Sequence, residues 1–319
     1  MRILLVKTSS LGDVVHNLPV ATDIMRRFAG AEIDWAVEES FAELPRLHPA
    51  IRRVIPVALR RWRKSLWSPA TWREIGDFKR AIKADAYDAV IDTQGLLKSA
   101  LIAREARGPR IGHDRGSARE PVAARFYDRQ FAVPRALHAV QRNRLLAAEA
   151  LGYVPSAEID YGISARPLTA DWLPQGDYAV LLTATSRAEK EWPEADWQTL
   201  GKALTAAGLH CVLPSGSARE RERATRLAAG LGDCGIAAPA LNLTELAGLL
   251  AGARVVIGVD TGLIHLAAAL GRPAIALYCG SDPALTGVLA GNDAINLGAT
   301  GAPPKADAVV CQALDSLRR

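Results

Sequence analysis

The stretch at residues 254–270, RVVIGVDTGLIHLAAAL, constrains the fold more than any other segment of the chain. Its first part, Arg254–Val259, is short, apolar and β-branched, which is typical of a buried parallel strand. Its second part, Gly262–Leu270, is apolar at helical density and stops at Gly271-Arg272-Pro273, a sequence that ends helices. The stretch therefore predicts a strand, a tight turn and a helix.

The turn itself consists of Asp260, Thr261 and Gly262. A turn that leads from a strand into a helix leaves backbone N–H groups without partners, at the positive end of the helix dipole. Such a turn suits a phosphate group. Many α/β proteins share this property, so the turn alone does not identify a function.

The same alternation of strand and helix recurs along the chain, and it predicts a parallel sheet covered on both faces. A helix is expected to start near Asp13 and to tolerate Pro19 in its first turns. The expected strands are Arg2–Lys7, Glu32–Val37, Arg53–Val57, Ala89–Asp92, Tyr178–Thr183, His210–Leu213, Arg254–Val259 and Ala274–Tyr278. The other expected helices are Pro69–Lys83, Leu96–Arg107, His138–Leu151, Glu194–Ala207, Ala218–Ala229, Thr244–Ala251, Gly262–Leu270 and Ala306–Leu317.

The pattern indicates two domains. Residues Pro155–Pro174 show little periodicity and several prolines, as in a linker, so we place the boundary near residue 160, between domains at 1–160 and 161–319. Residues Arg107–Arg135 are rich in Arg, Gly and Pro and are expected to form surface loops with short elements. The predicted architecture is two βαβ domains in tandem with a cleft between them, where ligands of open α/β sheets collect.

Composition is that of a soluble globular protein, with 49% hydrophobic and 23% charged residues in 319. No apolar segment reaches the roughly 18 residues that span a bilayer. The N-terminal segment is too briefly apolar for a signal peptide and is expected to be a strand. The four cysteines are far apart and form no metal-binding pattern, which favours reduced thiols in a cytosolic protein.

Charge is distributed unevenly between the two halves. Residues 1–165 contain 26 Lys and Arg against 19 Asp and Glu, whereas residues 166–319 contain 13 against 15. A basic N-terminal half indicates an anionic partner, such as nucleic acid, a phosphorylated substrate or a membrane surface. A solvated, arginine-rich surface is the alternative explanation.

In the N-terminal half, Asp13 follows the loop after the first expected strand. A carboxylate at the C-terminal end of a parallel strand faces the ligand-binding edge, where it can act as a general base toward a hydroxyl. The alternative is that Asp13 only caps the helix that begins there. His16, three residues later, is either a second polar group of this site or a histidine satisfied within the core.

In the C-terminal half, the loop TSRAEKEWP follows the first expected strand and carries Arg187 and Lys190. Both can neutralise a diphosphate, or they belong to an exposed charged loop. Glu222 is able to accept hydrogen bonds from a ribose, although it also fits a solvated helix face. His265 lies one helical turn beyond Thr261 and is either part of the phosphate site or packed within the helix.

The densest basic segment is Arg60–Lys64, RRWRK, with Trp62 inside it and Trp67 and Trp72 soon after. Basic groups interleaved with tryptophan suit nucleic acid, a phosphoglycolipid or an anionic membrane surface. No nucleic-acid-binding module accompanies them, so nucleic acid is not an expected partner. The chain also lacks a Walker GxxxxGK[ST], a GxGxxG after the first strand, and an Asp-x-Asp or His/Asp metal cluster.

Three motifs in order, KTSSLGDVVHNLP, TSRAEKEWP and VDTGLIHLAAALGRP, together with the segment HAVQRN at His138–Asn143, resemble the ADP-heptose:lipopolysaccharide heptosyltransferases. The resemblance covers essentially the whole chain, and the first motif is closer to the branch that adds the first heptose than to the second heptosyltransferase. It implies a GT-B fold, two Rossmann-like domains facing across a central cleft, with the acceptor on the N-terminal domain and the nucleotide sugar on the C-terminal one. It further implies inverting transfer of L-glycero-D-manno-heptose from ADP-heptose to Kdo-lipid A. ADP-heptose is then a co-substrate, and no cofactor or metal is expected.

The resemblance also assigns roles to residues at matching positions. Asp13 would be the catalytic base. The nucleotide sugar would be bound by Thr185, Ser186, Arg187, Lys190, Glu222, Leu241, Asp260, Thr261, Gly262 and His265. The acceptor would be bound by Arg60, Arg61, Arg63, Lys64 and Arg119. The enzyme would be a peripheral protein on the cytoplasmic face of the inner membrane of a Gram-negative bacterium, bound to an anionic lipid surface.

Two other functions stay open from the sequence. One is a related GT-B transferase with another sugar or acceptor, such as a heptosyltransferase II-like enzyme. The other is a non-catalytic nucleotide-binding α/β protein.

Overall fold

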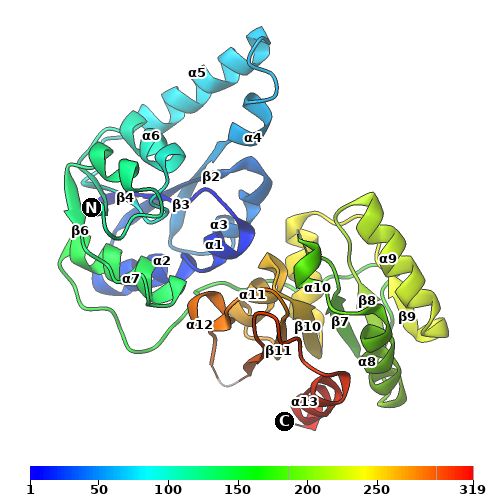
Figure 1. Cartoon of the computed structure of the whole chain (residues 1–319). Coiled ribbons are helices and arrows are strands. Elements are labelled where there is room, and N and C mark those ends of the chain that lie inside the picture. Colours follow the sequence, from blue (N-terminus) through cyan, green and yellow to red (C-terminus); the bar gives the residue numbers. More distant parts are fainter. Residues whose placement is uncertain (186, 292, 319) are drawn as a thin grey trace. The chain divides into compact units, whose positions relative to one another are not determined.

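The computed structural model describes residues 1–185, 187–291 and 293–318 of the chain. The chain divides into two compact units, Met1–Ile163 and Ser164–Arg319, each built around one sheet (Figure 1). The sequence places the domain boundary near residue 160, close to this division.

The first unit contains a six-stranded sheet whose paired strands are all parallel. In spatial order its strands are β3 (Ile51–Val57), β2 (Glu32–Glu38), β1 (Arg2–Val6), β4 (Ala89–Asp92), β5 (Arg110–His113) and β6 (Arg129–Phe131). Its α-helices are α1 (Leu11–Val15), α2 (Leu18–Arg27), α3 (Glu43–Arg46), α4 (Leu59–Trp62), α5 (Pro69–Lys83), α6 (Leu97–Glu105) and α7 (Ala139–Leu151).

The second unit repeats this architecture with a second parallel sheet. In spatial order its strands are β12 (Ala294–Gly298), β11 (Ala274–Tyr278), β10 (Val255–Val259), β7 (Tyr178–Leu182), β8 (His210–Leu213) and β9 (Gly235–Ala237). Its α-helices are α8 (Glu194–Ala206), α9 (Ala218–Ala229), α10 (Leu243–Gly252), α11 (Gly262–Ala269), α12 (Pro283–Thr286) and α13 (Ala306–Arg318).

Both sheets have the strand order of a Rossmann fold. Counted within each unit, the order is 3-2-1-4-5-6, so the first strand lies beside the fourth: β1 beside β4, and β7 beside β10. The direction of winding reverses between these two strands, and ligands of open α/β sheets bind where the carboxyl ends of such a pair meet. Ligand-binding residues are therefore expected directly after β1 and β4 in the first unit. In the second unit they are expected directly after β7 and β10.

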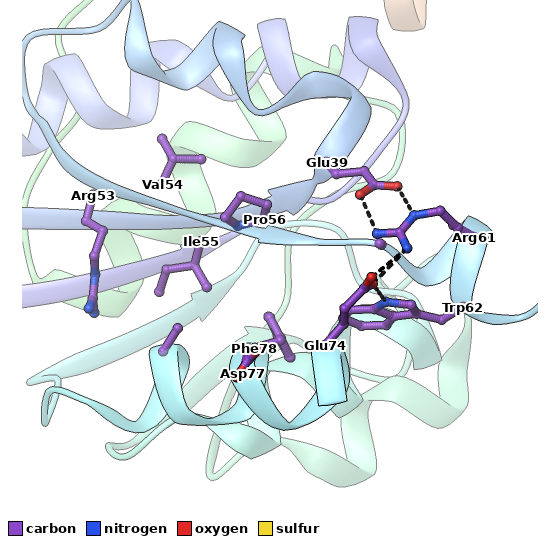
Figure 2. Close-up of a pocket in the computed structure, with 12 residues that line it drawn as sticks. Glu39, Arg53, Val54, Ile55, Pro56, Arg61, Trp62, Glu74, Asp77 and Phe78 are labelled. Carbon is purple, nitrogen blue, oxygen red and sulfur yellow. Dashed lines mark hydrogen bonds and ion pairs between the residues drawn. The ribbon is translucent and has the colours of Figure 1, made fainter. Parts of the chain in front are cut away.

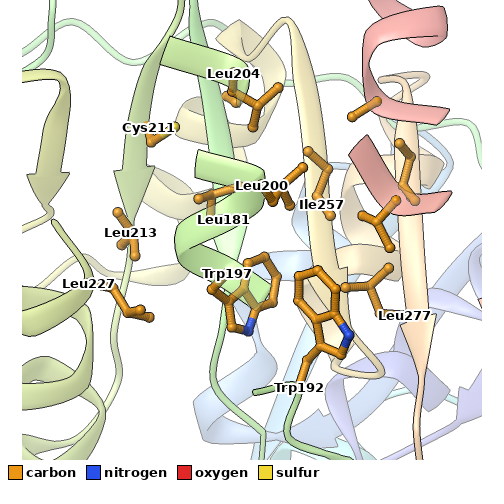
Figure 3. Packing of buried hydrophobic residues seen from close by; sticks show 14 of the residues in the cluster. Leu181, Trp192, Trp197, Leu200, Leu204, Cys211, Leu213, Leu227, Ile257 and Leu277 are labelled. Carbon is orange, nitrogen blue, oxygen red and sulfur yellow. The ribbon is translucent and has the colours of Figure 1, made fainter. Parts of the chain in front are cut away.

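The core of the second unit shows why the sheet is stable (Figure 3). Central strands β7 and β10 are buried at every position, as expected for parallel strands covered on both faces. Trp192 and Trp197 pack edge to face, with ring centroids 5.0 Å apart and an interplanar angle of 87°, against Leu181, Leu200 and Ile257 in one apolar cluster. Burial of this cluster supplies the hydrophobic free energy that holds α8 on the sheet.

Most of the predicted elements are confirmed, and β4, β8, β11, α5 and α9 have the predicted bounds. The continuous helix expected from Asp13 is wrong. The structure has two helices, α1 and α2, with a break at His16 and Asn17. Pro19 lies in the first turn of α2, where the missing N–H of proline costs no hydrogen bond.

Residues Arg107–Arg135 contain short elements, as expected, but the sequence did not predict that two of them, β5 and β6, are strands that complete the first sheet. The strands β9 and β12 in the second unit were not predicted either. These strands are three to five residues long, and β6, β9 and β12 are partly exposed, which weakens the apolar signal on which sequence prediction depends. Strand β5 is largely buried, but its sequence RIGH is too short and too polar to give that signal.

Candidate functional site

A cluster of polar side chains surrounds Asp260, the residue that follows β10 at the switch point of the second sheet. The Lys190 Nζ donates to Asp260 Oδ2 at 2.5 Å, and the Ser281 hydroxyl donates to the same oxygen at 2.6 Å. On the other carboxylate oxygen, Oδ1, His265 Nε2 lies 3.5 Å away. The four residues come from the loop after β7, the end of β10, helix α11 and the loop after β11.

Burial would raise the pKa of the Asp260 carboxyl, because a buried charge loses its hydration. Hydrogen bonds from His265, Lys190 and Ser281, with the charge of Lys190, outweigh that effect and hold this pKa well below its usual range. Asp260 is therefore an anion that fixes a lysine and a histidine in place. Thr185 joins the cluster by donating from Oγ1 to the Asp260 carbonyl at 3.3 Å.

The helix that starts beside this cluster is α11, and it begins at Gly262 as predicted. Its N-cap residue, Thr261, has extended backbone angles (φ −141°, ψ 157°), and within the described residues its side chain accepts no capping hydrogen bond. The first amides of the helix thus remain available to an anion, beside the ammonium of Lys190. This arrangement is able to bind a phosphate and to stabilise negative charge that develops on it.

The remaining residues predicted for the nucleotide lie in the loops around this sheet edge. Arg187 is exposed and pairs with Glu189 at 3.3 Å, and Ser186 lies outside the described residues. Leu241 is half-buried just before the N-cap of α10.

Glu222 lies on an exposed face of α9. Glu220 was not predicted as a site residue. Its Oε2 accepts a hydrogen bond at 2.7 Å from the amide of Gly216, which lies in the loop that follows β8. Of the two acids, Glu220 is the one directed toward the loop at the carboxyl end of β8, the edge of the sheet where ligands of such folds bind. The geometry therefore favours Glu220 over Glu222.

In the first unit, Asp13 occupies the third position of α1, directly after the loop that follows β1. Its Oδ2 accepts from the Ser10 amide at 2.8 Å and from the Ser10 hydroxyl at 3.2 Å, so it does cap the helix. The Arg119 guanidinium lies 3.7 Å from the same oxygen. The side chain remains 26% exposed, and among the described residues its contacts fall on Oδ2. Capping thus leaves the second oxygen, Oδ1, for another role.

Beneath Asp13 lies Lys7, a residue that the sequence did not single out. Its Nζ donates to the Thr93 carbonyl at 2.9 Å and to Asn143 Oδ1 at 3.2 Å, and only 5% of the residue is exposed. Burial lowers the pKa of Lys7 to about 8, against the attraction of Asp13 and Asp92. The signal was available, because a lysine that ends the first strand of a Rossmann sheet points to the switch point.

The two histidines of this region are core residues. His16 is 3% exposed and packs edge to face on His138, with ring centroids 5.5 Å apart. His138 is the N-cap of α7 and accepts from the Val140 amide through Nδ1.

The basic segment at α4 divides into two kinds of residue. Arg61 is bound within the unit, to Glu39 at 2.9 Å and to Glu74 at 2.7 Å (Figure 2). Arg60 lies over the Phe41 ring, 5.4 Å from its centroid. Arg63 and Lys64 are exposed and have no ion-pair partner among the described residues. The pair formed by Arg61 closes one end of a pocket of about 350 Å³ between β3 and α5, whose floor includes Ile55, Pro56 and Phe78.

In the described part of the chain no three His, Cys, Asp or Glu side chains are grouped to hold a metal ion. No helix in residues 1–185, 187–291 or 293–318 is long and apolar enough to cross a membrane. All four cysteines are described, and none forms a disulfide.

Comparison with known proteins gives a consistent result. Residues 75–312 match the family model described as glycosyltransferase family 9 (heptosyltransferase). Lipopolysaccharide heptosyltransferase 1 of Pseudomonas aeruginosa is 50% identical over 300 residues, 93% of this chain and 84% of that protein. Lipopolysaccharide heptosyltransferase 2 of Salmonella typhimurium is 26% identical over 313 residues, 90% of this chain and 85% of that protein.

Solved structures agree with the sequence comparison. The Escherichia coli heptosyltransferase WaaC with ADP has a TM-score of 0.91 and 43% identity, covering 99% of this chain and 100% of that one. The same enzyme with ADP-2-deoxy-2-fluoro heptose has a TM-score of 0.86 and 43% identity, covering 99% of each. Two Rossmann-like sheets and this likeness give the chain a GT-B-type fold. The chain is a glycosyltransferase and belongs to glycosyltransferase family 9, the heptosyltransferases.

Proposed function

We propose that this chain is a heptosyltransferase I, which transfers L-glycero-D-manno-heptose from ADP-heptose to Kdo-lipid A during assembly of the lipopolysaccharide core. The family membership and the 50% identity to a lipopolysaccharide heptosyltransferase 1 support this activity. In this proposal the second unit binds the nucleotide sugar and the first unit binds the acceptor. The enzyme works at the cytoplasmic face of the inner membrane of a Gram-negative bacterium.

The observation that carries the proposal is the cluster of Lys190, Asp260 and His265 at the start of α11. It combines a fixed ammonium with the free amides of a helix N-terminus, which is what a diphosphate requires. Related enzymes have been solved with ADP and with a fluorinated ADP-heptose, which supports the same class of donor here. Thr261 and Gly262 supply the amides, and Thr185 and Arg187 follow β7 at the same edge of the sheet. Ser186, between them in the sequence, is assigned to the donor as well.

The adenosine part of the donor is assigned to the neighbouring loops. Glu220, which is bound to the loop after β8, is a better candidate for the ribose hydroxyls than Glu222. Leu241 supplies an apolar contact for the adenine.

The acceptor is assigned to the basic groups of the first unit. Kdo-lipid A carries carboxylates and phosphates, and Arg63, Lys64 and Arg119 are exposed cations that suit them. Arg60 adds a fourth, held over Phe41. The Arg61 guanidinium is already bound by Glu39 and Glu74. Arg61 therefore acts on the acceptor site indirectly, by holding α4 in position.

The chemistry is a single displacement. The Asp13 carboxylate takes the proton of the acceptor hydroxyl while that oxygen forms a bond to the anomeric carbon of the heptose. The bond from this carbon to the β-phosphate oxygen breaks on the opposite face, so the configuration is inverted. ADP leaves, and Lys190 with the α11 amides stabilises the charge that grows on its phosphate. No metal is needed in this scheme.

The proposal is tested by incubating the full chain with ADP-heptose and heptoseless Kdo-lipid A, followed by mass analysis of the lipid. The expected result is the gain of one heptose residue, with one ADP released for each. Absence of any gain, with the donor shown by calorimetry to bind, would overturn the assignment of the acceptor. Binding of neither ADP-heptose nor ADP would overturn the whole proposal.

The runner-up is a heptosyltransferase II-like activity. It is disfavoured by the 26% identity to a heptosyltransferase 2, against 50% to a heptosyltransferase 1. The same assay separates them when it includes an acceptor that already carries one heptose. A heptosyltransferase I should leave that acceptor unchanged.

A further inference from the structure

The turn between α4 and α5 exposes large apolar side chains to solvent. Trp67 is 99% exposed, Trp72 is 60% exposed and Leu66 is 48% exposed. Figure 1 shows this turn at the far end of α5, where it projects from the sheet of the first unit. We call residues 63–73 the tip.

The tip is held in shape by hydrogen bonds and packing. The Trp72 indole N–H donates to the Leu66 carbonyl at 2.8 Å, which fixes the chain just before Trp67. At the base of the tip, Trp62 is buried, and its indole N–H donates to Glu74 Oε2 at 2.8 Å while its ring packs on Phe78 with centroids 5.8 Å apart. The exposed rings are therefore presented by an ordered element.

The charges around these rings are positive. Arg63, Lys64 and Arg73 have no ion-pair partner within the described residues. The two acids of this part of α5 are already neutralised, Glu74 by Arg61 and Asp77 by Arg80. An open groove of about 590 Å³ is lined by Trp67, Trp72, Arg73 and Arg80, among others.

Exposed tryptophan flanked by cations is typical of protein segments that bind the interface of an anionic bilayer. The indole ring partitions to the level of the lipid headgroups, and arginine and lysine pair with lipid phosphates there. A protein partner fits less well, because a stable protein interface buries about 800 Å² on each side, and a single projecting turn is too small for that.

We propose that the tip is a membrane anchor, which inserts Trp67 and Leu66 into the interface of an anionic lipid bilayer while Arg63, Lys64 and Arg73 bind lipid phosphates, those of the lipid-linked acceptor included. This inference rests on the proposed function in one respect, since a lipid-linked acceptor lies in such a surface. It places the first unit, which is assigned to the acceptor, against the bilayer.

The first test measures binding of the full chain to vesicles that contain no acceptor. Flotation with vesicles of 70% phosphatidylethanolamine and 30% phosphatidylglycerol is compared with flotation on pure phosphatidylcholine. We expect strong preference for the anionic vesicles, weakened by high salt. The double variant Trp67→Ser with Leu66→Ser should lower the partition coefficient about tenfold or more. The matched control is Val154→Ser, a residue that is 90% exposed in the same unit.

The second test removes the charges. The triple variant Arg63→Gln, Lys64→Gln and Arg73→Gln should lower the partition coefficient by about two orders of magnitude, at roughly fivefold for each cation. A control triple, Arg125→Gln, Lys202→Gln and Arg221→Gln, changes three exposed cations elsewhere by the same amount. Equal losses in the two triples would show that net charge alone attracts the protein, and would overturn the anchor.

The third test separates this inference from the proposed function. With a deacylated, water-soluble acceptor, the Trp67→Ser and Leu66→Ser double variant should transfer heptose at the native rate. With the acceptor embedded in anionic vesicles, the double variant should transfer heptose more slowly, by the same factor by which its partition coefficient falls. Failure of the native chain to transfer heptose to either acceptor would overturn the proposed function but leave vesicle binding as evidence for the anchor. Native binding only to vesicles that contain acceptor would overturn the anchor, because the tip would then bind the acceptor itself.

Discussion

The ammonium of Lys190 lies 2.5 Å from the carboxylate of Asp260, directly beside the N-terminus of α11. Both residues were predicted from the sequence to bind a diphosphate, yet their roles must differ. A carboxylate repels a phosphate, so Asp260 serves by holding Lys190 and His265 in position, and its pKa below the usual range keeps it charged for that purpose. In the proposed function the ammonium of Lys190 meets the phosphate already oriented, which lowers the cost of binding and of charge development.

This relationship predicts different kinetics for variants of the two residues. Lys190→Ala should lower kcat by about 10²–10³, because it removes the group that stabilises the charge growing on the phosphate as ADP departs, and it should also weaken ADP binding. Asp260→Asn should have a smaller effect on kcat, since the amide still accepts from Ser281, but it should weaken ADP binding by releasing Lys190. Single-turnover rates and calorimetry with ADP measure the two effects. Equal effects of both variants on kcat would contradict the division of roles.

Replacement of Asp13 tests the proposed base. Asp13→Asn should lower the rate of transfer by about 10²–10⁴, because an amide does not accept the proton of the acceptor hydroxyl. Donor affinity should stay nearly unchanged, since the nucleotide is assigned to the other unit. Asparagine still accepts hydrogen bonds from the Ser10 amide and hydroxyl, so the cap of α1 should survive.

Asp13→Ala is the matched comparison, because it removes the cap together with the base. It should lose activity to a similar extent and in addition about 1 kcal/mol of stability. If Asp13→Asn retains near-native turnover, Asp13 is only a capping residue.

The ribose assignment is tested by a pair of conservative variants two positions apart. Glu220→Gln should weaken ADP binding by about tenfold, the cost of weakening charge-assisted hydrogen bonds to the ribose hydroxyls. Glu222→Gln should have almost no effect, because this residue lies on the exposed face of α9. Calorimetric titration with ADP measures both. The reverse order of effects would restore Glu222 to the site.

The fold was largely accessible from the sequence because three of the four central strands, β4, β7 and β10, are buried at every position, and β1 is buried from Ile3 onward. Such strands are apolar throughout, as at Tyr178–Leu182 and Val255–Val259, and the turns that follow them carry the functional residues. The short strands near the sheet edges, such as Arg129–Phe131, were missed because their exposed side chains are polar. They take their structure from the strand beside them, which the local sequence does not describe.

Site prediction failed where a role depends on a tertiary partner. Arg61 and Arg63 are indistinguishable in the segment RRWRK, but only Arg61 meets two carboxylates, from Glu39 before α4 and Glu74 after it. For Lys7 the position at the end of the first strand was a usable signal, but its hydrogen-bond partners, Thr93 and Asn143, are distant in sequence and could not be predicted.

Arg61 and Arg63 are therefore expected to give opposite results. Arg61→Ala should lower the thermal midpoint, because it breaks the ion pairs that join α4 and α5 to the end of β2, and it should change the acceptor KM only through that loss of structure. Arg63→Ala should leave the midpoint unchanged and raise the acceptor KM, with an effect that shrinks at high salt. Thermal unfolding and acceptor titrations at two salt concentrations distinguish them. A lower midpoint in Arg63→Ala would mean that this residue also has a partner.

The buried lysine gives a prediction about pH. Burial lowers the pKa of Lys7 from its ordinary value of 10.5 to about 8 in the folded chain. Between these two values the unfolded chain binds a proton that the folded chain lacks, so the free energy of unfolding rises with pH, by at most about 1.4 kcal/mol per unit and roughly 3 kcal/mol in all. Below pH 8 both states are protonated, and Lys7 contributes no pH dependence.

Urea unfolding of the native chain and of Lys7→Met at several pH values from 7 to 10.5 measures this effect. The native chain should gain stability relative to the variant only above pH 8. Lys202→Met, at an exposed lysine of α8, is the matched control. Parallel pH profiles for the native chain and Lys7→Met would show that Lys7 keeps its proton in the folded state. The gain in stability above pH 8 would instead show that burial lowers the pKa of this amine to about 8 in the folded chain.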